Sequence, residues 1–141
     1  MSDKITICAN APVAPALVPV LASHFTVIVC PNFDPLAAGL SGEEVASIRG
    51  LLTVGHAAVN SSVLERFPCV VVVAANGVGV DHINISDCTS RGVRVGNTPG
   101  VIAPATADLA FGLLLGLARN IVAGDKSMHL FCARVSTHLC A

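Results

Sequence analysis

Short apolar runs alternate along this chain with segments in which apolar residues recur at helical spacing. The runs are rich in valine and isoleucine and are bounded by glycine, proline or asparagine, as β-strands often are. They predict five strands, at Lys4–Ala9, Thr26–Cys30, Leu51–Val54, Val70–Ala74 and Val93–Val95. Continuous apolar strands are typical of parallel sheets that are covered on both faces. Val70–Ala74 is the most apolar run, so we place it in the middle of the sheet.

The first segment between strands is expected to form a helix over Ala14–Phe25, because Leu17, Leu21 and Phe25 recur every four residues. Pro19 does not suit the interior of that helix, since proline lacks the amide N–H that a helical turn uses. The apolar spacing nevertheless favours a helix across the segment.

Residues that commonly cap helix N-termini mark three further helices. The caps are Ser41, with Glu44 three residues later in a capping-box pattern, Asn60 or Ser61, and Asn84. The helices that they begin are predicted to end at about Arg49, Phe67 and Ser90. The last helical segment, Pro104–Ala123, is predicted to be one helix of roughly 20 residues.

This alternation predicts an α/β fold, namely a doubly wound parallel sheet of about five strands followed by a long helix. The chain has 141 residues, a length that suits one compact domain. Hydrophobic residues make up 53% of it and charged residues 12%, a balance that excludes a disordered chain. The 8 basic and 9 acidic residues leave no basic face of the kind that binds nucleic acid.

No membrane span or signal peptide is expected. The most apolar long stretch, residues 101–123, is interrupted by Pro104, Asp108 and Arg119. We therefore expect a cytoplasmic protein whose six cysteines are reduced and are buried or incidental. A zinc site could be assembled near the C-terminus, but the ligand spacing matches no common pattern, and we expect no metal. Its ligands would be His129, Cys132, His138 and Cys140.

A glycine-rich loop, Asn76–Asp81, follows the run Val70–Ala74, where open α/β sheets bind ligands. Gly77 and Gly79 would let backbone N–H groups turn toward an anion, which predicts a nest for a small carboxylate or phosphate. The alternative is a tight turn that merely requires glycine. The dinucleotide-binding fingerprint is not met, because His82 stands where its third glycine would be.

A second segment of interest, Asn97–Phe111, leaves the last strand through a Pro-Gly turn and enters the long helix. Thr106 and Asp108 lie in the first turn of that helix, where an acidic side chain is favourable to the helix dipole. The start of a helix would by itself explain these residue types.

These segments together resemble the D-2-hydroxyacid dehydrogenase family, above all its glyoxylate/hydroxypyruvate and hydroxyphenylpyruvate reductases. The resemblance rests on three motifs, which are Asn76–Asp81, Gly92–Val95 with Asn97-Thr98-Pro99, and Ala105–Phe111. It extends to Gly55–Asn60 and, more weakly, to the chain before about residue 50.

The resemblance implies a flavodoxin-like substrate domain over residues 1–100 and a helix over 101–126 that leads, in the family, into an NAD-binding domain. It also implies that the glycine-rich loop binds the carboxylate of a small 2-oxo acid and that Asp81 closes this loop. The residues so assigned to the substrate are His56, Asn76, Gly77, Val78 and Gly79. Thr106 is assigned to the cofactor, NAD or NADP, near its nicotinamide.

The chain departs from the family in its second half. It has no dinucleotide fingerprint and no catalytic Arg, Glu or His in the family's context, and residues 127–141 match nothing in the family. We therefore expect a fragment of an NAD(P)-dependent oxidoreductase that neither holds the cofactor nor turns over substrate by itself. The alternative is a non-catalytic carboxylate-binding or interaction module that competes for the partner surface of a full-length enzyme.

The helix predicted over Pro104–Ala123 is apolar in every direction around its axis. A helix of this kind normally lies inside a larger structure, and exposed apolar area drives association. We expect the chain to self-associate through this helix or to pair with a full-length homologue.

Overall fold

The computed structural model describes the backbone of residues 4–138 and the side chains of residues 4–129. Contacts within the chain divide it into two compact units, Met1–Pro99 and Gly100–Ala141. The first unit holds the sheet and the helices that cover it, and the second unit holds two helices.

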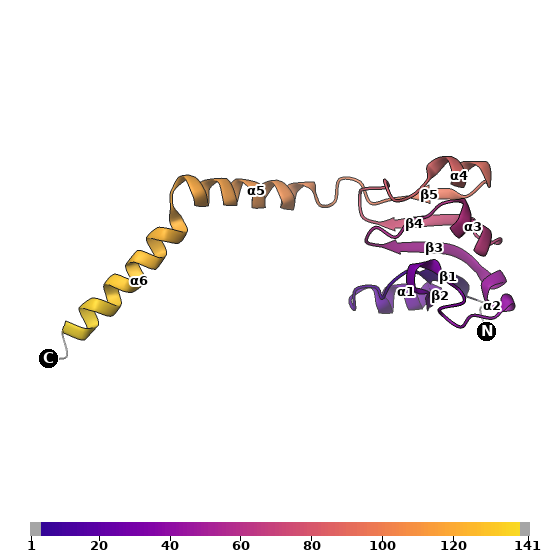
Figure 1. Cartoon of the computed structure of the whole chain (residues 1–141), viewed down its shortest axis with the longest axis horizontal. Helices are drawn as coiled ribbons and strands as arrows, with labels where there is room; N and C mark the ends of the chain where they lie inside the picture. Colours follow the sequence, from indigo (N-terminus) through magenta and orange to yellow (C-terminus); the bar gives the residue numbers. More distant parts are fainter. Residues whose placement is uncertain (1–3, 139–141) are drawn as a thin grey trace. The chain divides into compact units, whose positions relative to one another are not determined.

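The first unit is built on a five-stranded sheet, shown in Figure 1, in which every neighbouring pair of strands is parallel. The strands are β1 (Ile5–Ala9), β2 (Phe25–Val29), β3 (Ile48–Val54), β4 (Val72–Asn76) and β5 (Arg94–Gly96). Their order across the sheet is β2-β1-β3-β4-β5, which is the order of flavodoxin-like folds. The structure thus confirms the parallel α/β sheet of five strands.

One placement within the sheet was wrong. The middle strand is β3, and β4 lies between β3 and the edge strand β5. A continuous apolar run shows that a strand is covered on both faces, but it does not show where the strand lies in the sheet. β3 and β4 both lie inside the sheet, so the apolar run could not distinguish between their two positions. Strand β3 also begins earlier than expected, at Ile48, whose side chain is fully buried.

The early start of β3 brings Gly50 between its two neighbouring strands. A Cβ atom at Gly50 would lie 3.2 Å from a side-chain methyl of Ile7 in β1 and 3.2 Å from one of Val72 in β4. These contacts are tighter than those that most real Cβ atoms make, so the absence of a side chain lets the strands pack as they do. The preceding helix, α2 (Gly42–Ser47), therefore ends before Arg49, where we had expected it to end.

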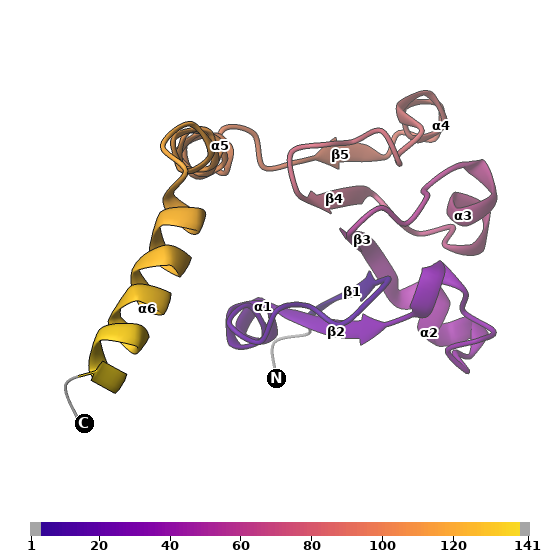
Figure 2. The same ribbon diagram turned by 60° about the vertical axis from the view of Figure 1, so that its left-hand side comes forward.

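The predicted helix caps are confirmed. Ser41 forms a capping box with Glu44 at the start of α2, and Asn60 caps α3 (Ser61–Arg66) by accepting from the Val63 N–H. Asn84 caps α4 (Ile85–Ser90) through its side-chain oxygen, which accepts from two backbone N–H groups. In Figure 2 these three helices lie together, apart from α1 (Val18–His24).

Helix α1 is shorter than the helix that we predicted over residues 14–25. It begins at Val18, so Pro19 stands in its first turn. The N–H groups of a first turn have no partner within the helix, and a proline there loses no hydrogen bond. The predicted conflict of Pro19 with a helix interior is thus avoided by a later start.

The core lies around β1, β3 and β4 and includes the edge-to-face pair Phe33 and Phe67, whose ring centroids are 6.3 Å apart. The thiols of Cys8, Cys30 and Cys88 are fully buried in it. Burial raises the pKa of each of these thiols, because a thiolate would be desolvated there. These three cysteines therefore pack as small apolar side chains, as expected, whereas Cys140 lies outside the described residues.

The second unit corrects the prediction of a single long helix. It contains α5 (Ala103–Ala118) and α6 (Ile121–His138), which meet at an angle of 58°. Asn120, between them, has a φ of 55°, a left-handed conformation that asparagine tolerates better than most residues and that ends helices. The helix that we expected to run unbroken from residue 104 to residue 123 is therefore interrupted at residues 119–120.

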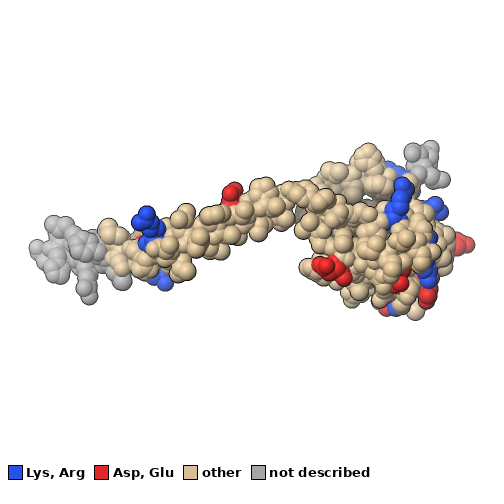
Figure 3. Space-filling view, turned by 90° about the horizontal axis from the view of Figure 1, so that it is seen from above, with Lys and Arg blue, Asp and Glu red and all other residues tan. Residues whose placement is uncertain are grey.

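The surface of α5 is almost entirely uncharged in Figure 3, and none of its side chains is buried. Within the described residues no single helix has both the length and the hydropathy to cross a membrane, although the bent pair formed by residues 103–118 and 121–129 passes that test together. The side chains of residues 130–141, most of the segment that we set apart as a tail, lie outside the described ones.

Candidate functional site

The carboxyl ends of the parallel strands meet at one edge of the sheet, where ligands bind in folds of this class. The segments that follow four of the strands there are Asn10, Gly55–Ala58, Gly77–His82 and Asn97–Pro99. This edge contains all of the residues that we predicted to contact the substrate, with Asn76 as the last residue of β4. These segments therefore form the candidate site.

The glycine-rich loop after β4 is held by the segment after β5. The Thr98 N–H donates to the Gly77 carbonyl over 3.0 Å, and the Asn97 side-chain amide donates to the Val78 carbonyl over 2.8 Å. Among the described residues, no hydrogen-bond acceptor is engaged by the N–H groups of Gly77, Val78 and Gly79. The loop thus has its carbonyls fixed and three N–H donors left available to a ligand, as a nest requires.

Asp81 folds back over this loop. Its Oδ2 atom lies 3.6 Å from the position that a Cβ atom on Gly79 would take, a distance of ordinary van der Waals contact. The role that the family resemblance implies for Asp81, closing the carboxylate loop, stays a prediction.

The loop after β4 is also joined to the segment after β3. The Val59 N–H donates to the His82 carbonyl over 2.9 Å, and the Asn84 N–H donates to the Val59 carbonyl over 2.8 Å. Val59 and Ile83 form a short parallel bridge between the two segments, and both side chains are buried. The loop that carries His56 is therefore fixed next to the loop that carries Gly77–Gly79.

His56 and His82 lie ring to ring at this junction. Their ring centroids are 5.6 Å apart and the planes meet at 70°, an edge-to-face arrangement. His82 Nε2 lies 3.1 Å from the hydroxyl of Thr53, a buried residue of β3. His82 Nδ1 is buried and has no partner among the described residues, whereas His56 is exposed.

His82 was not predicted to be part of the site. From the sequence it stands out only as the residue that replaces a glycine of the dinucleotide fingerprint. A histidine directly after Asp81, on a loop that leaves a strand at the ligand-binding edge, was the available signal. Its partner Thr53 could not be found in the same way, because their contact depends on the order of β3 and β4 in the sheet.

Thr106, the residue assigned to the cofactor, lies in the second unit, in the first turn of α5. Its hydroxyl donates to the Ile102 carbonyl over 3.1 Å, so its one proton is used within the helix. The 141 residues contain no glycine-rich dinucleotide loop. The residues present therefore do not fit a dinucleotide.

The structure offers no support for a metal site in the part of the chain with described side chains, where no three His, Cys, Asp or Glu residues gather. His129 Nε2 lies 3.5 Å from Asp125 one helical turn away. The other three candidate ligands, Cys132, His138 and Cys140, fall outside the described side chains.

An open groove of about 610 Å³ lies beside β5 and α4. Of the glycine-rich loop and the residues that anchor it, only Val80 and Asn97 line this groove. His56 is not among the lining residues. The groove therefore lies next to the candidate site without containing its N–H donors.

Comparison with known proteins relates the chain to one enzyme family. The family model "D-isomer specific 2-hydroxyacid dehydrogenase, catalytic domain" matches residues 6–139. This match runs into residues 127–139, which we had set apart as a non-family tail, and that assignment stays a prediction. The glyoxylate reductase of Thermococcus litoralis is 45% identical over 94 residues, which make up 65% of this chain and 28% of that enzyme.

Solved structures show the same relationship. A 2-hydroxyacid dehydrogenase from Ketogulonicigenium vulgare superposes with a TM-score of 0.77 at 27% identity, covering 86% of this chain and 38% of that one. The NADPH-dependent glyoxylate/hydroxypyruvate reductase of Sinorhizobium meliloti, in complex with NADP and malonate, gives a TM-score of 0.68 at 28% identity, covering 81% of this chain and 34% of that one.

The chain thus spans less than a third of the length of the Thermococcus relative, while the family model extends over most of the chain. The sheet order, the glycine-rich loop at its carboxyl edge and these matches agree with one another. The chain belongs to the D-isomer specific 2-hydroxyacid dehydrogenase family, whose members are NAD(P)-dependent oxidoreductases, and it corresponds to the part called the catalytic domain.

Proposed function

We propose that this chain provides the 2-oxo acid-binding part of a reductase of the glyoxylate/hydroxypyruvate type. The observation that carries the proposal is the set of three N–H groups on Gly77, Val78 and Gly79, which meet no acceptor among the described residues, in a loop whose carbonyls are held by Asn97 and Thr98. Successive backbone N–H groups without a protein acceptor suit the oxygens of a small carboxylate. The glyoxylate reductase relative and the malonate complex of another relative support the same class of ligand.

In this proposal the chain binds and orients the substrate. The loop N–H groups hold the carboxylate, and His56 on the neighbouring loop lies over the oxo group. Hydride transfer is the chemistry of a nicotinamide cofactor, and the protein around it contributes position and charge. Because the residues present do not fit a dinucleotide, we expect the reaction to require residues beyond these 141.

Binding is tested by recording backbone amide NMR spectra of the chain during titration with hydroxypyruvate at millimolar concentration. We expect shift changes concentrated at residues 76–81 and at His56. Hydroxyacetone, which keeps the ketone and hydroxyl but lacks the carboxylate, is the matched control ligand and is expected to leave these signals in place. Unchanged loop signals with hydroxypyruvate would contradict the proposal.

The anchor of the loop offers a matched pair of variants. Asn97→Ala removes the donor to the Val78 carbonyl and should weaken hydroxypyruvate binding, because the loop is then free to turn its N–H groups away. Ser62→Ala, at an exposed position of α3 that does not line the groove beside the loop, should leave binding unchanged. Equal affinities of the two variants would show that the anchored loop is not the binding element.

Catalysis is tested separately by following NADH and NADPH oxidation in the presence of hydroxypyruvate. We expect no turnover above the uncatalysed rate from these 141 residues. Measurable turnover would show that the chain holds the cofactor after all. Neither the family match nor the relatives favour the alternative of a non-catalytic interaction module.

A further inference from the structure

His82 joins the loop after β4 to β3 and to the segment that follows β3. Its carbonyl accepts from the Val59 N–H, its Nε2 lies within hydrogen-bond distance of Thr53, and its ring contacts the ring of His56 edge to face. It lies three residues after Gly79 on the same loop. His82 therefore contacts the segment that carries His56 while belonging to the loop that carries Gly77–Gly79.

The imidazole of His82 is energetically unfavourable at this position, and packing alone does not explain why a polar ring is found there. Thr53 can either donate to Nε2 or accept from it, and in both tautomers of the imidazole the buried Nδ1 atom is left without a partner among the described residues. A buried polar atom without a partner is unfavourable. A leucine or phenylalanine would fill the same space without that cost, so the imidazole suits a role beyond filling the core.

Few side chains at this edge of the sheet can be charged, and two of them are the histidines. In the segments that follow β1, β3, β4 and β5, only His56 and His82 can carry a positive charge, and Asp81 carries a negative one. A bound carboxylate would rely on N–H donors and on an imidazole for its electrostatic stabilisation. Because His56 is exposed and His82 is partly buried, the ring that can reach a ligand is that of His56.

We propose that His82 is a positioning residue, which fixes the His56 ring beside the Gly77–Gly79 loop through its hydrogen bond to Thr53. This inference rests on the proposed function, since it concerns the binding of the same carboxylate ligand. His82 itself does not touch the ligand, and its effect is on the orientation of His56 and on the loop that both histidines connect.

The test compares three variants by the hydroxypyruvate dissociation constant, measured by NMR titration of the loop amides. His82→Phe keeps an aromatic ring against His56 but loses Nε2, and Thr53→Val removes the hydroxyl with little change in shape. Both should weaken binding by about 5-fold, which corresponds to one ordinary hydrogen bond. The double variant should be no weaker than either single one, because both remove the same interaction.

His82→Gln separates the two contacts of the ring. A glutamine can still place a polar atom near Thr53, but it has no ring to lie against His56. We expect the amide signals of Gly77–Gly79 to stay close to those of the unsubstituted chain in this variant. The ring-proton signals of His56, which the His82 ring current influences, should shift.

Val63→Ala is the control for a merely structural effect. Val63 is buried in α3 and takes no part in the hydrogen bonds of His82 or of the glycine-rich loop, so its truncation should destabilise the fold without removing those contacts. The dissociation constant of this variant should match that of the unsubstituted chain at a temperature where both are folded.

The possible outcomes separate the two proposals. If the unsubstituted chain binds hydroxypyruvate and His82→Phe and Thr53→Val bind it equally well, the positioning role is overturned and the proposed function stands. If the unsubstituted chain shows no binding at the loop, both are overturned. Should His82→Phe fail to fold, the nearly isosteric Thr53→Val decides the result, because it tests the same hydrogen bond.

Discussion

Asn10 and Val54 are joined by a pair of hydrogen bonds from one amide side chain. Asn10 Nδ2 donates to the Val54 carbonyl over 3.0 Å, and the Val54 N–H donates to Asn10 Oδ1 over 2.6 Å. Asn10 follows β1 and Val54 ends β3, so its buried amide continues the pairing of the two strands past the last residue of β1. This contact fixes the start of the loop that carries His56.

Replacing Asn10 by alanine should destabilise the fold. The change removes both hydrogen bonds and leaves two backbone groups of Val54 without a protein partner, which should lower the free energy of unfolding by about 2 kcal/mol. Urea denaturation followed by circular dichroism measures this loss. Ser62→Ala, at an exposed position of α3, is the control and should change stability by less than about 0.5 kcal/mol. Equal stability of the two variants would contradict the structural role of Asn10.

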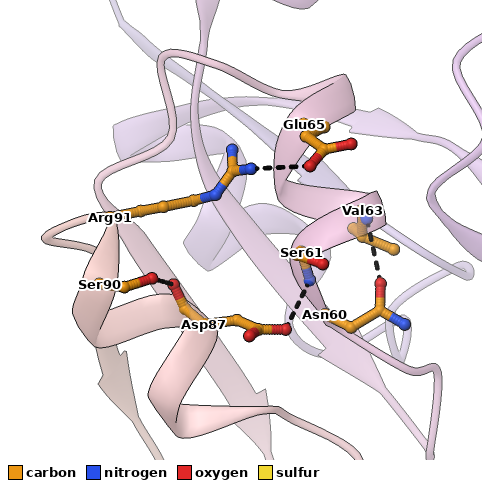
Figure 4. A network of polar contacts seen from close by, with 7 residues as sticks. All are labelled: Asn60, Ser61, Val63, Glu65, Asp87, Ser90 and Arg91. Carbon is orange, nitrogen blue, oxygen red and sulfur yellow. Dashed lines mark hydrogen bonds and ion pairs between the residues drawn. The ribbon is translucent and has the colours of Figure 1, made fainter.

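Helices α3 and α4 are connected by two polar contacts of different strength, drawn in Figure 4. Asp87 Oδ2 accepts from the Ser61 N–H over 2.7 Å at the start of α3, and Arg91 pairs with Glu65 over 3.1 Å at the surface. We expect Asp87→Ala to lower the unfolding free energy by about 1–2 kcal/mol, as the loss of a charged helix cap does. Arg91→Ala should cost at most about 1 kcal/mol, because an exposed ion pair contributes little. Chemical denaturation of both variants would contradict this ranking if Arg91→Ala proved the more damaging.

The capping box of α2 gives the fold a pH dependence of known sign. The Ser41 backbone N–H and then the Ser41 hydroxyl donate to the Glu44 carboxylate and hold the pKa of Glu44 below its usual range. A lowered pKa in the folded state means that this stabilisation is fully present above the unfolded pKa and is lost as the pH falls through the folded pKa.

Glu44→Gln tests this prediction, since glutamine also completes a capping box but does not titrate in this range. The stability difference between the original chain and Glu44→Gln, obtained from thermal unfolding at a series of pH values, should be constant near neutrality. It should shrink as the pH falls through the folded pKa of Glu44. A difference that does not vary with pH would show that the carboxylate gains nothing from Ser41.

The exposed apolar residues of α5 should make the chain associate. Leu114 and Leu117 are 59% and 82% exposed, and their neighbours along the helix are similarly open. Covering one such side chain contributes roughly 1.5–3 kcal/mol, so several together favour contact with a second copy. We expect Leu114→Lys or Leu117→Lys to raise solubility and shift the chain toward monomer in sedimentation experiments. Sedimentation of the original chain as a monomer at tens of micromolar would contradict this expectation.

Local features of the fold could be predicted from the sequence because they depend on residues that are close together in the chain. The starts of three helices could be predicted from Ser41, Asn60 and Asn84, because the side chain of a capping residue accepts from N–H groups two or three residues later in the chain. The apolar runs predicted five parallel strands for a similar reason. A strand that is buried on both faces has apolar residues at consecutive positions, so each run alone indicates this burial. The glycine-rich loop was found in the same way.

Other local predictions were wrong where two tendencies competed. The spacing of leucines favoured a long first helix, but Pro19 is accommodated only in a first turn, and α1 begins at Val18. The apolar residues of the C-terminal segment favoured one helix, whereas the left-handed conformation of Asn120 divides it into α5 and α6. In both cases one backbone position outweighed a pattern spread over many residues.

Tertiary structure alone decided which segments meet at the candidate site. The order of the strands places β3 beside β4, and only this order brings Thr53 to His82 and His56 to the same junction. Asn10 and Val54 are 44 residues apart in the chain, and no local pattern predicts their contact. The sequence by itself determined the helices, the strands and the glycine-rich loop. Which of these segments lie next to one another was decided only by the sheet, because the pairing of strands depends on hydrogen bonds and packing across the whole sheet.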